Sequence, residues 1–100
     1  MELYNNRGDA YGEIKKYSKA IADYTKAIKL DPKDSTAYLI RSLAYLDLKR
    51  YSDAIADCNT VIELKPELAM AYQARGEVYI ALGKTKEANA DFAKAKSLEK

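Results

Sequence analysis

The sequence predicts an all-α fold in which three similar units stack along the chain. The first observation is a period of 34 residues: residues 1–34 and 35–68 share 14 identities without gaps, and residues 35–68 and 69–100 share 9. The second is that apolar residues within each unit recur at helical spacing. The third is the scarcity of turn formers, with four glycines and two prolines in 100 residues. Such a period indicates a stacked array, because no single unit can bury its apolar face alone.

Each unit is predicted to contain two antiparallel helices, which gives six helices in three hairpins within one domain, residues 1–100. The units are residues 1–34, 35–68 and 69–100. In the first unit, the apolar face of the first helix consists of Leu3, Tyr4, Ala10, Tyr11 and Ile14. That of the second helix consists of Ala20, Ile21, Tyr24, Ala27 and Ile28.

The ends of these helices are predicted from capping residues. The second helices are expected to begin after N-caps at Ser18, Ser52 and Thr85. Gly83 is expected to end a first helix in a left-handed conformation. The two prolines, Pro32 and Pro66, stand where a second helix should stop, because proline disfavours helical geometry in the residue before it.

Seven positions are identical in all three units and indicate the shared packing. They are Tyr4/Tyr38/Tyr72, Arg7/Arg41/Arg75, Tyr11/Tyr45/Tyr79, Ala20/Ala54/Ala88, Ala22/Ala56/Ala90, Asp23/Asp57/Asp91 and Leu30/Leu64/Leu98. The aspartates lie on separate helices of separate units, so we interpret them as helix-surface or helix-contact residues and not as a catalytic cluster. The conserved alanines, with the small residues Gly8, Ser42 and Gly76, leave room for two backbones to approach closely.

Composition excludes several functional classes. The net charge of +2 combines 17 basic and 15 acidic residues, which argues against a nucleic-acid-binding protein. No apolar run approaches the roughly 20 residues that span a bilayer, and no signal peptide is visible. Cys58 is the only cysteine, which favours a reducing, cytoplasmic location. With no histidine, no glycine-rich phosphate loop and no ligand cluster, we expect neither an enzyme nor a metal or cofactor.

The repeated residues resemble the tetratricopeptide repeat family over the whole chain. Its pattern of aromatic, small and alanine positions with a closing proline is matched at Tyr4, Gly8, Tyr11, Ala20, Tyr24, Ala27 and Pro32. The second and third units repeat it, with Cys58 in place of an aromatic residue, Val61 in place of an alanine and Lys100 in place of the proline. Arginine stands at positions 7, 41 and 75, where leucine is common in the family. The resemblance implies a right-handed superhelical solenoid whose first helices line a concave groove. It also implies a non-catalytic scaffold that binds a peptide segment of a partner protein.

The residues expected to face that groove combine apolar side chains with carboxylates. They are Asn5, Asp9, Leu39, Ile40, Leu43, Leu46, Asp47, Met70, Gln73, Glu77 and Ile80. Some members of the family grip acidic chaperone tails with lysine, asparagine and arginine. Those members would carry such residues in place of Asn5, Asp9, Ile40, Met70 and Ala74. All five differ here, so the sequence predicts an apolar or basic peptide, and Asp9 would repel a carboxylate.

Three alternatives remain open at this stage. Leu39, Leu43 and Leu46 could pack between neighbouring first helices instead of binding a peptide. The apolar patch could also pair with a second copy, giving a homodimer through the groove or the repeat ends in place of the expected monomer. The lysines of the second helices are interrupted by acidic residues, which favours a solvated face over nucleic-acid binding.

Overall fold

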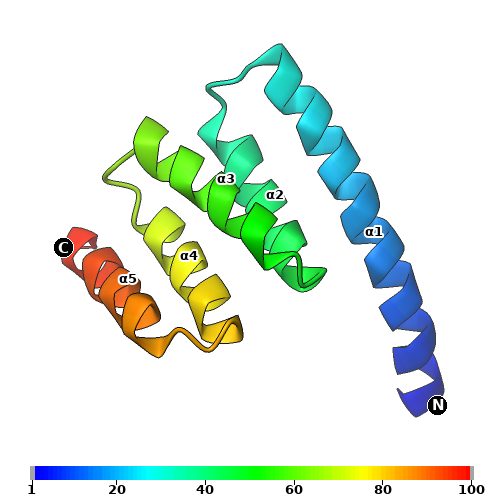
Figure 1. Cartoon of the computed structure of the whole chain (residues 1–100). Coiled ribbons are helices and arrows are strands. Elements are labelled where there is room, and N and C mark those ends of the chain that lie inside the picture. The colour runs from blue at the N-terminus through cyan, green and yellow to red at the C-terminus, as the bar shows by residue number, and fades with distance from the viewer. Residues whose placement is uncertain (1, 100) are drawn as a thin grey trace.

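The computed structural model describes the backbone of residues 2–99 and the side chains of residues 15–99. It contains five α-helices and, within residues 2–99, no strand. They are α1 (Glu2–Leu30), α2 (Ser35–Asp47), α3 (Tyr51–Leu64), α4 (Ala69–Ala81) and α5 (Thr85–Leu98) (Figure 1). The predicted all-α repeat architecture is therefore confirmed.

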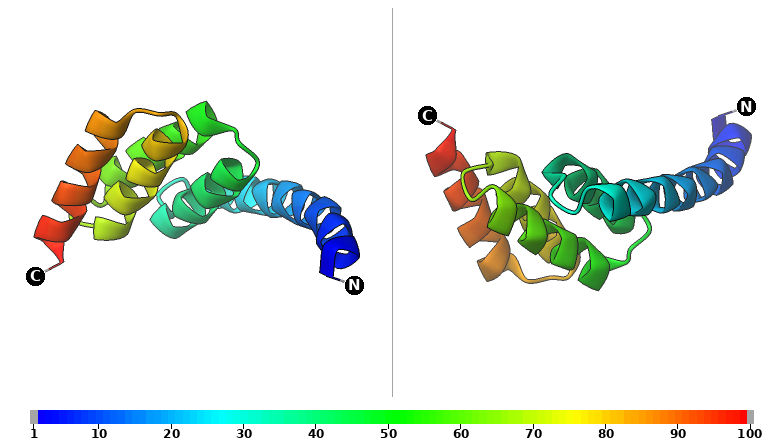
Figure 2. Two further views of the ribbon diagram at one scale, coloured as in Figure 1. Left: turned by 90° about the horizontal axis from the view of Figure 1, so that it is seen from below. Right: turned by 90° about the horizontal axis from the view of Figure 1, so that it is seen from above.

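The helices stack in chain order. α2 packs on α3 and α4 packs on α5, so that each pair forms a hairpin, and α3 packs against α4 to join the hairpins. α2 also contacts α4, which makes these two first helices neighbours. α1 contacts α2 and none of the other helices, and its N-terminal half projects beyond them (Figures 1 and 2).

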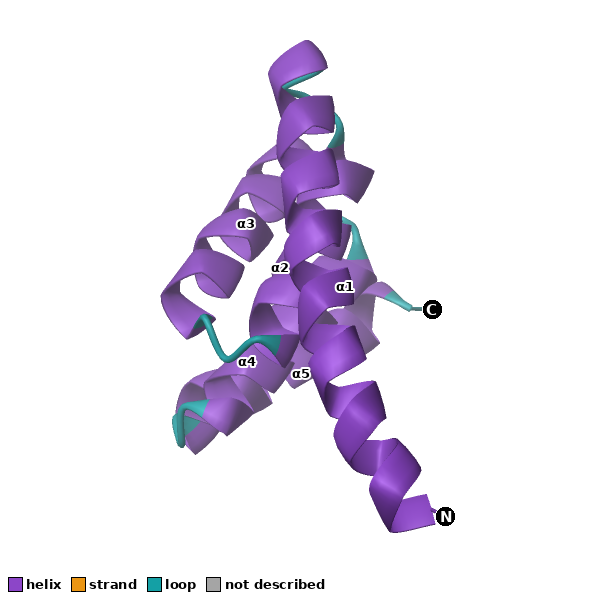
Figure 3. Cartoon of the chain, turned by 90° about the vertical axis from the view of Figure 1, so that its right-hand side faces the viewer, coloured by secondary structure: helices purple, strands orange, loops and turns teal. Residues whose placement is uncertain are grey.

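The prediction of six helices was wrong, because the first unit contains one continuous helix. Ser18 therefore lies inside α1 and caps nothing. In the other units the turn requires a residue with positive φ, which is Lys49 (φ 64°) in one and Gly83 (φ 78°) in the other. The equivalent residue of the first unit is Lys15, for which positive φ has the same cost as for Lys49, so a turn forms there only if other contacts offset that cost. Figure 3 shows α1 as one unbroken helix, seen from the side of the molecule on which it lies.

A physical reason for the continuous helix is charge. In the α2–α3 turn, Arg50 forms an ion pair with Asp53 at 2.8 Å and lies over the ring of Tyr45. The residues equivalent to Arg50 and Asp53 in the first unit are Lys16 and Lys19, two like charges. The first unit thus lacks the ion pair that accompanies the turn after α2, and helical propensity prevails.

The predicted N-caps Ser52 and Thr85 were also wrong. α3 begins at Tyr51 after Arg50 and α5 begins at Thr85 after Lys84, and neither N-cap residue makes a side-chain cap hydrogen bond. The chain leaves the left-handed residue and enters the next helix at once, so the cap falls before the hydroxyl residue. The predictions for Gly83 and for the two prolines are confirmed, since α1 and α3 end at Leu30 and Leu64.

The core lies where the two hairpins meet. Its buried cluster consists of Leu39, Cys58, Val61, Ala71 and Ala74, with Tyr38, Ile62 and Leu68 packed against it. Within each hairpin, a small residue of the first helix faces the side chain found 16 positions later. A Cβ on Gly76 would lie 2.6 Å from Cε1 of Phe92. The hydroxyl of Ser42 donates to the carbonyl oxygen of Leu39 at 2.6 Å and lies close enough to the Cys58 thiol to oppose the rise in its pKa. Glycine therefore accommodates an aromatic ring, whereas serine accommodates the smaller thiol.

Candidate functional site

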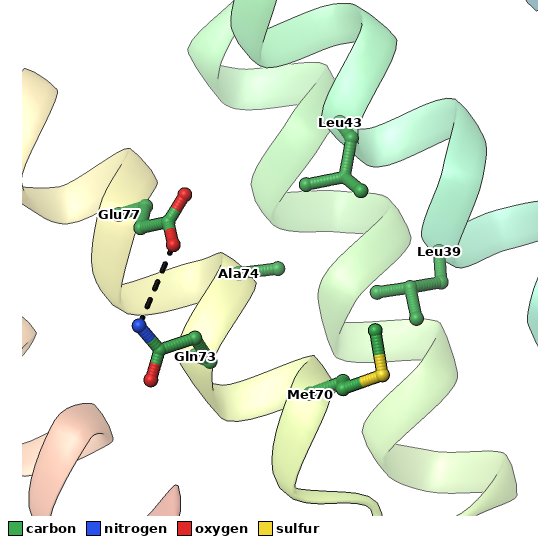
Figure 4. Close-up of a pocket in the computed structure, with 6 residues that line it drawn as sticks. All are labelled: Leu39, Leu43, Met70, Gln73, Ala74 and Glu77. Carbon is green, nitrogen blue, oxygen red and sulfur yellow. Dashed lines mark hydrogen bonds between the residues drawn. The ribbon is translucent and has the colours of Figure 1, made fainter.

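The structure brings residues of α2 and α4 together around a pocket of about 260 Å³. Leu39 and Leu43 come from α2, and α4 supplies the other four lining residues, Met70, Gln73, Ala74 and Glu77 (Figure 4). These side chains meet because residues three or four apart share one face of a helix. Two adjacent first helices then place their faces side by side.

The apolar lining residues differ in how much of each side chain remains available. Leu39 is only 7% exposed and belongs to the core cluster, so it forms the floor of the pocket. Leu43 is 37% exposed and Met70 is 61% exposed. These two can lose water contact when a ligand binds, and the unbranched thioether of Met70 can adapt to the ligand's shape.

The polar side of the pocket is acidic. Gln73 donates a hydrogen bond from Nε2 to Oε2 of Glu77 at 3.4 Å, and both residues are exposed (Figure 4). Among the six lining residues Glu77 is the only charged one. A carboxylate beside exposed apolar carbons can orient a lysine or arginine of a bound segment while its stem or neighbours contact Leu43 and Met70.

Of the eleven residues predicted for the groove, five line this pocket: Leu39, Leu43, Met70, Gln73 and Glu77. Four others lie on the same two helices but outside the lining, namely the half-buried Ile40 and Leu46 and the exposed Asp47 and Ile80. The side chains of Asn5 and Asp9 lie outside the described residues. Ala74, the sixth lining residue, stands at one of the five clamp positions of the groove that the sequence analysis named.

A larger hollow, of about 380 Å³, lies against residues 65–68 between α3 and α4. Its lining comes from one loop, so no second element converges on it with recognition groups. The α2–α4 pocket joins two helices and a carboxylate, and is the better candidate for binding.

Two largely buried ion pairs, which were not predicted from the sequence, hold the helices that form the walls of the site. Arg41 donates to both carboxylate oxygens of Asp57, at 2.8 and 2.7 Å, and Arg75 does the same with Asp91 at 2.8 and 2.8 Å. Asp57 is 4% exposed and Asp91 is 5% exposed. The available signal was two invariant columns of opposite charge at a constant separation of 16 residues.

Each of these arginines also reaches the preceding unit. Arg41 donates to Oγ1 of Thr25 at 3.0 Å, and Arg75 donates to Oδ1 of Asn59 at 2.8 Å. The hydrogen bond with its aspartate, followed by the Coulomb attraction, raises the pKa of each guanidinium despite the opposing desolvation. These contacts link successive units and fix the first helices that carry the pocket residues.

Tyrosine rings enclose the same guanidinium groups. Cζ of Arg41 lies 5.7 Å from the ring centre of Tyr38 and 5.6 Å from that of Tyr45. Arg75 lies between Tyr72 and Tyr79 in the same way, at 5.7 and 6.0 Å. Cation–π contact therefore supplements each ion pair and explains why Tyr and Arg repeat together.

Cys58 is completely buried, and burial raises the pKa of its thiol to about 11. A thiol in that environment is a poor nucleophile, so it fills core space in place of an aromatic residue. Among residues 15–99, no three Asp, Glu or Cys side chains cluster closely enough to hold a metal ion. None of the described helices is both long and apolar enough to cross a membrane.

The fold and the pocket define a helical-repeat protein with a side-chain-lined depression between successive first helices. The family comparison is specific: tetratricopeptide repeat models match residues 2–34, 23–56 and 69–100. The chain belongs to the tetratricopeptide repeat family. No curated protein sequence matches it.

Several solved structures are similar over most of the chain. The first tetratricopeptide domain of Spaghetti (RPAP3), bound to the HSP90 peptide SRMEEVD, is 35% identical with a TM-score of 0.82, covering 94% of this chain and 75% of that one. The Arabidopsis OM64 domain is 36% identical with a TM-score of 0.82, covering 98% and 81%. The second domain of human RPAP3, in complex with the HSP70 peptide SGPTIEEVD, is 34% identical with a TM-score of 0.80, covering 95% and 79%.

Proposed function

We propose that this protein is a non-catalytic interaction module that binds an apolar and basic peptide segment in the α2–α4 pocket. The observation that carries the proposal is the combination of exposed Leu43 and Met70 with the carboxylate of Glu77 around one depression. Peptide recognition by similar domains supports the general role, since two of them were solved with chaperone peptides.

The preference for a basic segment is argued from residues of this chain. An acidic tail would need cationic groups, but Ile40, Met70 and Ala74 stand where clamp members of the family carry asparagine, lysine and arginine. Glu77 in the lining would repel a ligand carboxylate and attract a lysine or arginine. Burial of apolar side chains against Leu43 and Met70 supplies the remaining affinity.

Two matched peptides test this preference. The acidic probe is SRMEEVD with a free C-terminus, the peptide bound by a similar domain. The basic probe is SRMKKVN with an amidated C-terminus, which keeps the arginine, methionine and valine and reverses the central charge. By fluorescence anisotropy, the basic probe should bind more tightly, and its affinity should fall as salt increases. Tighter binding of SRMEEVD would contradict the proposed preference.

Variants locate the binding surface. Leu39 is unsuitable because its burial means that Leu39→Glu would disrupt the core. Met70→Ala and Leu43→Ala remove exposed apolar carbon and should each weaken binding about 5- to 30-fold, from roughly 1–2 kcal/mol of lost contact. Leu30→Ala truncates a leucine exposed on α1, outside the pocket lining, and is the matched control. Equal affinity in all three variants would overturn the assignment of the pocket.

The charge contribution is tested separately. Glu77→Gln keeps the size of the side chain and should weaken binding of the basic probe while reducing its salt dependence. Glu87→Gln, on the exposed part of α5, is the control. If the Met70→Ala change instead converts a dimer of the free protein into a monomer, the pocket pairs two copies and the alternative of groove-to-groove self-association replaces peptide binding.

A further inference from the structure

The second half of α1 presents a face that its own unit leaves uncovered. In the two complete units, the alanines Ala54 and Ala88 are fully buried between the paired helices. Their equivalent in the first unit, Ala20, is only half-buried. The reason is that α1 packs against α2 alone, at the edge of the row in Figure 1, without a first helix of its own.

A carboxylate on this part of the chain also lacks its partner. Asp23 is exposed and makes no ion pair or hydrogen bond among the side chains of residues 15–99, whereas its equivalents Asp57 and Asp91 are buried in bidentate pairs. Each of those pairs uses the arginine 16 residues earlier, which for Asp23 is Arg7. Along a continuous helix the two residues are about 24 Å apart, so they cannot meet within one chain.

The N-terminal half of α1 carries the side chains that this face requires. Tyr4, Arg7 and Tyr11 repeat the spacing of the two tyrosines and the arginine that form each buried ion pair of α2 and α4. Gly8 has the same relation to the aromatic Tyr24 as Gly76 has to Phe92, where a Cβ would meet the ring. The segment is therefore complementary in charge and in volume to a surface that it cannot reach in its own chain.

We propose that residues 2–14 of a second copy cover this face, so that two chains exchange their N-terminal segments and form a dimer. The pairing within the hairpins sets the register, because Ser42 faces Cys58 and Gly76 faces Phe92. If the first unit keeps this register, Gly8 of one chain faces Tyr24 of the other, and the midpoint between the paired residues falls at residue 16. Two antiparallel α1 helices related by a two-fold axis at this residue satisfy both contacts at once.

This exchange also completes the groove. Neighbouring first helices lie side by side, as α2 and α4 do. The segment from the second copy would occupy the corresponding place beside α2, bringing Asn5 and Asp9 of one chain next to Leu39 and Leu43 of the other. The dimer interface is thus distinct from the α2–α4 pocket, and the exchange can fail without affecting peptide binding there.

Cysteine cross-linking of two distinguishable chains tests the exchange. In a Cys58→Ala background, Gly8→Cys is placed in one full-length chain and Tyr24→Cys in another that carries a tag of different mass. The chains are mixed in urea, refolded together and oxidised with oxidised glutathione. We expect a disulfide-linked heterodimer from the mixture, and almost no covalent dimer from either variant alone, because the exchange keeps like positions of the two chains about 24 Å apart.

Two results would overturn the proposal. One is a mixture that gives no heterodimer, with a monomer mass for the unmodified protein by light scattering at all concentrations from about 10 μM to 1 mM. The other is a single chain carrying both cysteines that closes an internal disulfide and stays monomeric, which would mean that residues 2–14 fold back on their own chain.

A hinge variant provides an independent readout in the unmodified background. Lys15→Gly supplies the residue that tolerates positive φ, and Lys19→Asp gives Lys16 a carboxylate three residues later, as Arg50 has in Asp53. The double variant should form the hairpin within one chain. Its dimer dissociation constant should rise at least tenfold, so that the measured mass shifts from dimer toward monomer. Lys26→Gly, at an exposed position of α1, controls for the loss of helix propensity and should remain dimeric. An unchanged dimer in the hinge variant would contradict the exchange.

Discussion

The Arg41–Asp57 pair allows a quantitative prediction about what holds the repeats together. We expect Arg41→Leu to lower the free energy of unfolding by about 3 kcal/mol, because it leaves a carboxylate that is 4% exposed without its counter-charge. The same change removes two cation–π contacts, at 5.7 and 5.6 Å, and the hydrogen bond to Thr25. Leucine retains an apolar stem between the two tyrosine rings, so packing loss is the smaller part of the cost.

A second change separates the charge from the packing. In Arg41→Leu/Asp57→Ala the buried carboxylate is gone, and we expect the double variant to recover at least about 1 kcal/mol relative to Arg41→Leu. Asp53→Asn is the control in the same unit. Asp53 pairs with Arg50, and the two side chains are 47% and 56% exposed. Exposed ion pairs of this kind contribute less than about 1 kcal/mol to the free energy of unfolding.

Urea denaturation followed by circular dichroism at 222 nm measures these differences. The Arg41→Leu transition should shift without a large change in slope, and its cost should change little between low salt and about 0.5 M salt, because the pair is shielded from solvent. An Arg41→Leu cost as small as that of Asp53→Asn, or a double variant no more stable than the single, would refute the reasoning.

The remaining predictions concern the core. Gly76→Ser should destabilise the protein by about 1–3 kcal/mol, because a Cβ would lie 2.6 Å from Phe92, and Gly76→Ser with Phe92→Cys should recover part of that loss in the same urea assay. Ala54→Leu, at a fully buried helix crossing, should cost about 1–3 kcal/mol by overpacking, and a loss below about 0.5 kcal/mol would argue against close packing there. Burial raises the pKa of Cys58 from 9.0 to about 11, so between these pH values the unfolded chain loses the thiol proton while the folded chain keeps it. The free energy of unfolding is therefore unaffected by this group below pH 9 and should fall by about 2 kcal/mol as the pH rises to 11. Comparison with Cys58→Ala over this range isolates the effect, since the two proteins differ only at this residue.

Much of the fold was predictable because local sequence determines it. The 34-residue period, the helical spacing and the positions of Gly83, Pro32 and Pro66 depend on interactions between residues a few positions apart, and such interactions can be read from one sequence. The side-by-side placement of Leu43, Met70 and Glu77 followed from the repeat, since equivalent helices of successive units must be neighbours.

Two features were decided by the tertiary structure alone. They depend on small differences between opposing free energies and on contacts between residues far apart in the sequence. Whether the first unit turns at Lys15 depends on a small difference between the cost of positive φ and the gain from closing a hairpin, and an equivalent lysine, Lys49, does turn. Leu39 and Leu43 have the same residue type and the same predicted face, yet only the packing of α3 and α4 buries the first and leaves the second exposed. Sequence determined which residues repeat, and the packing determined which of them remain free to bind.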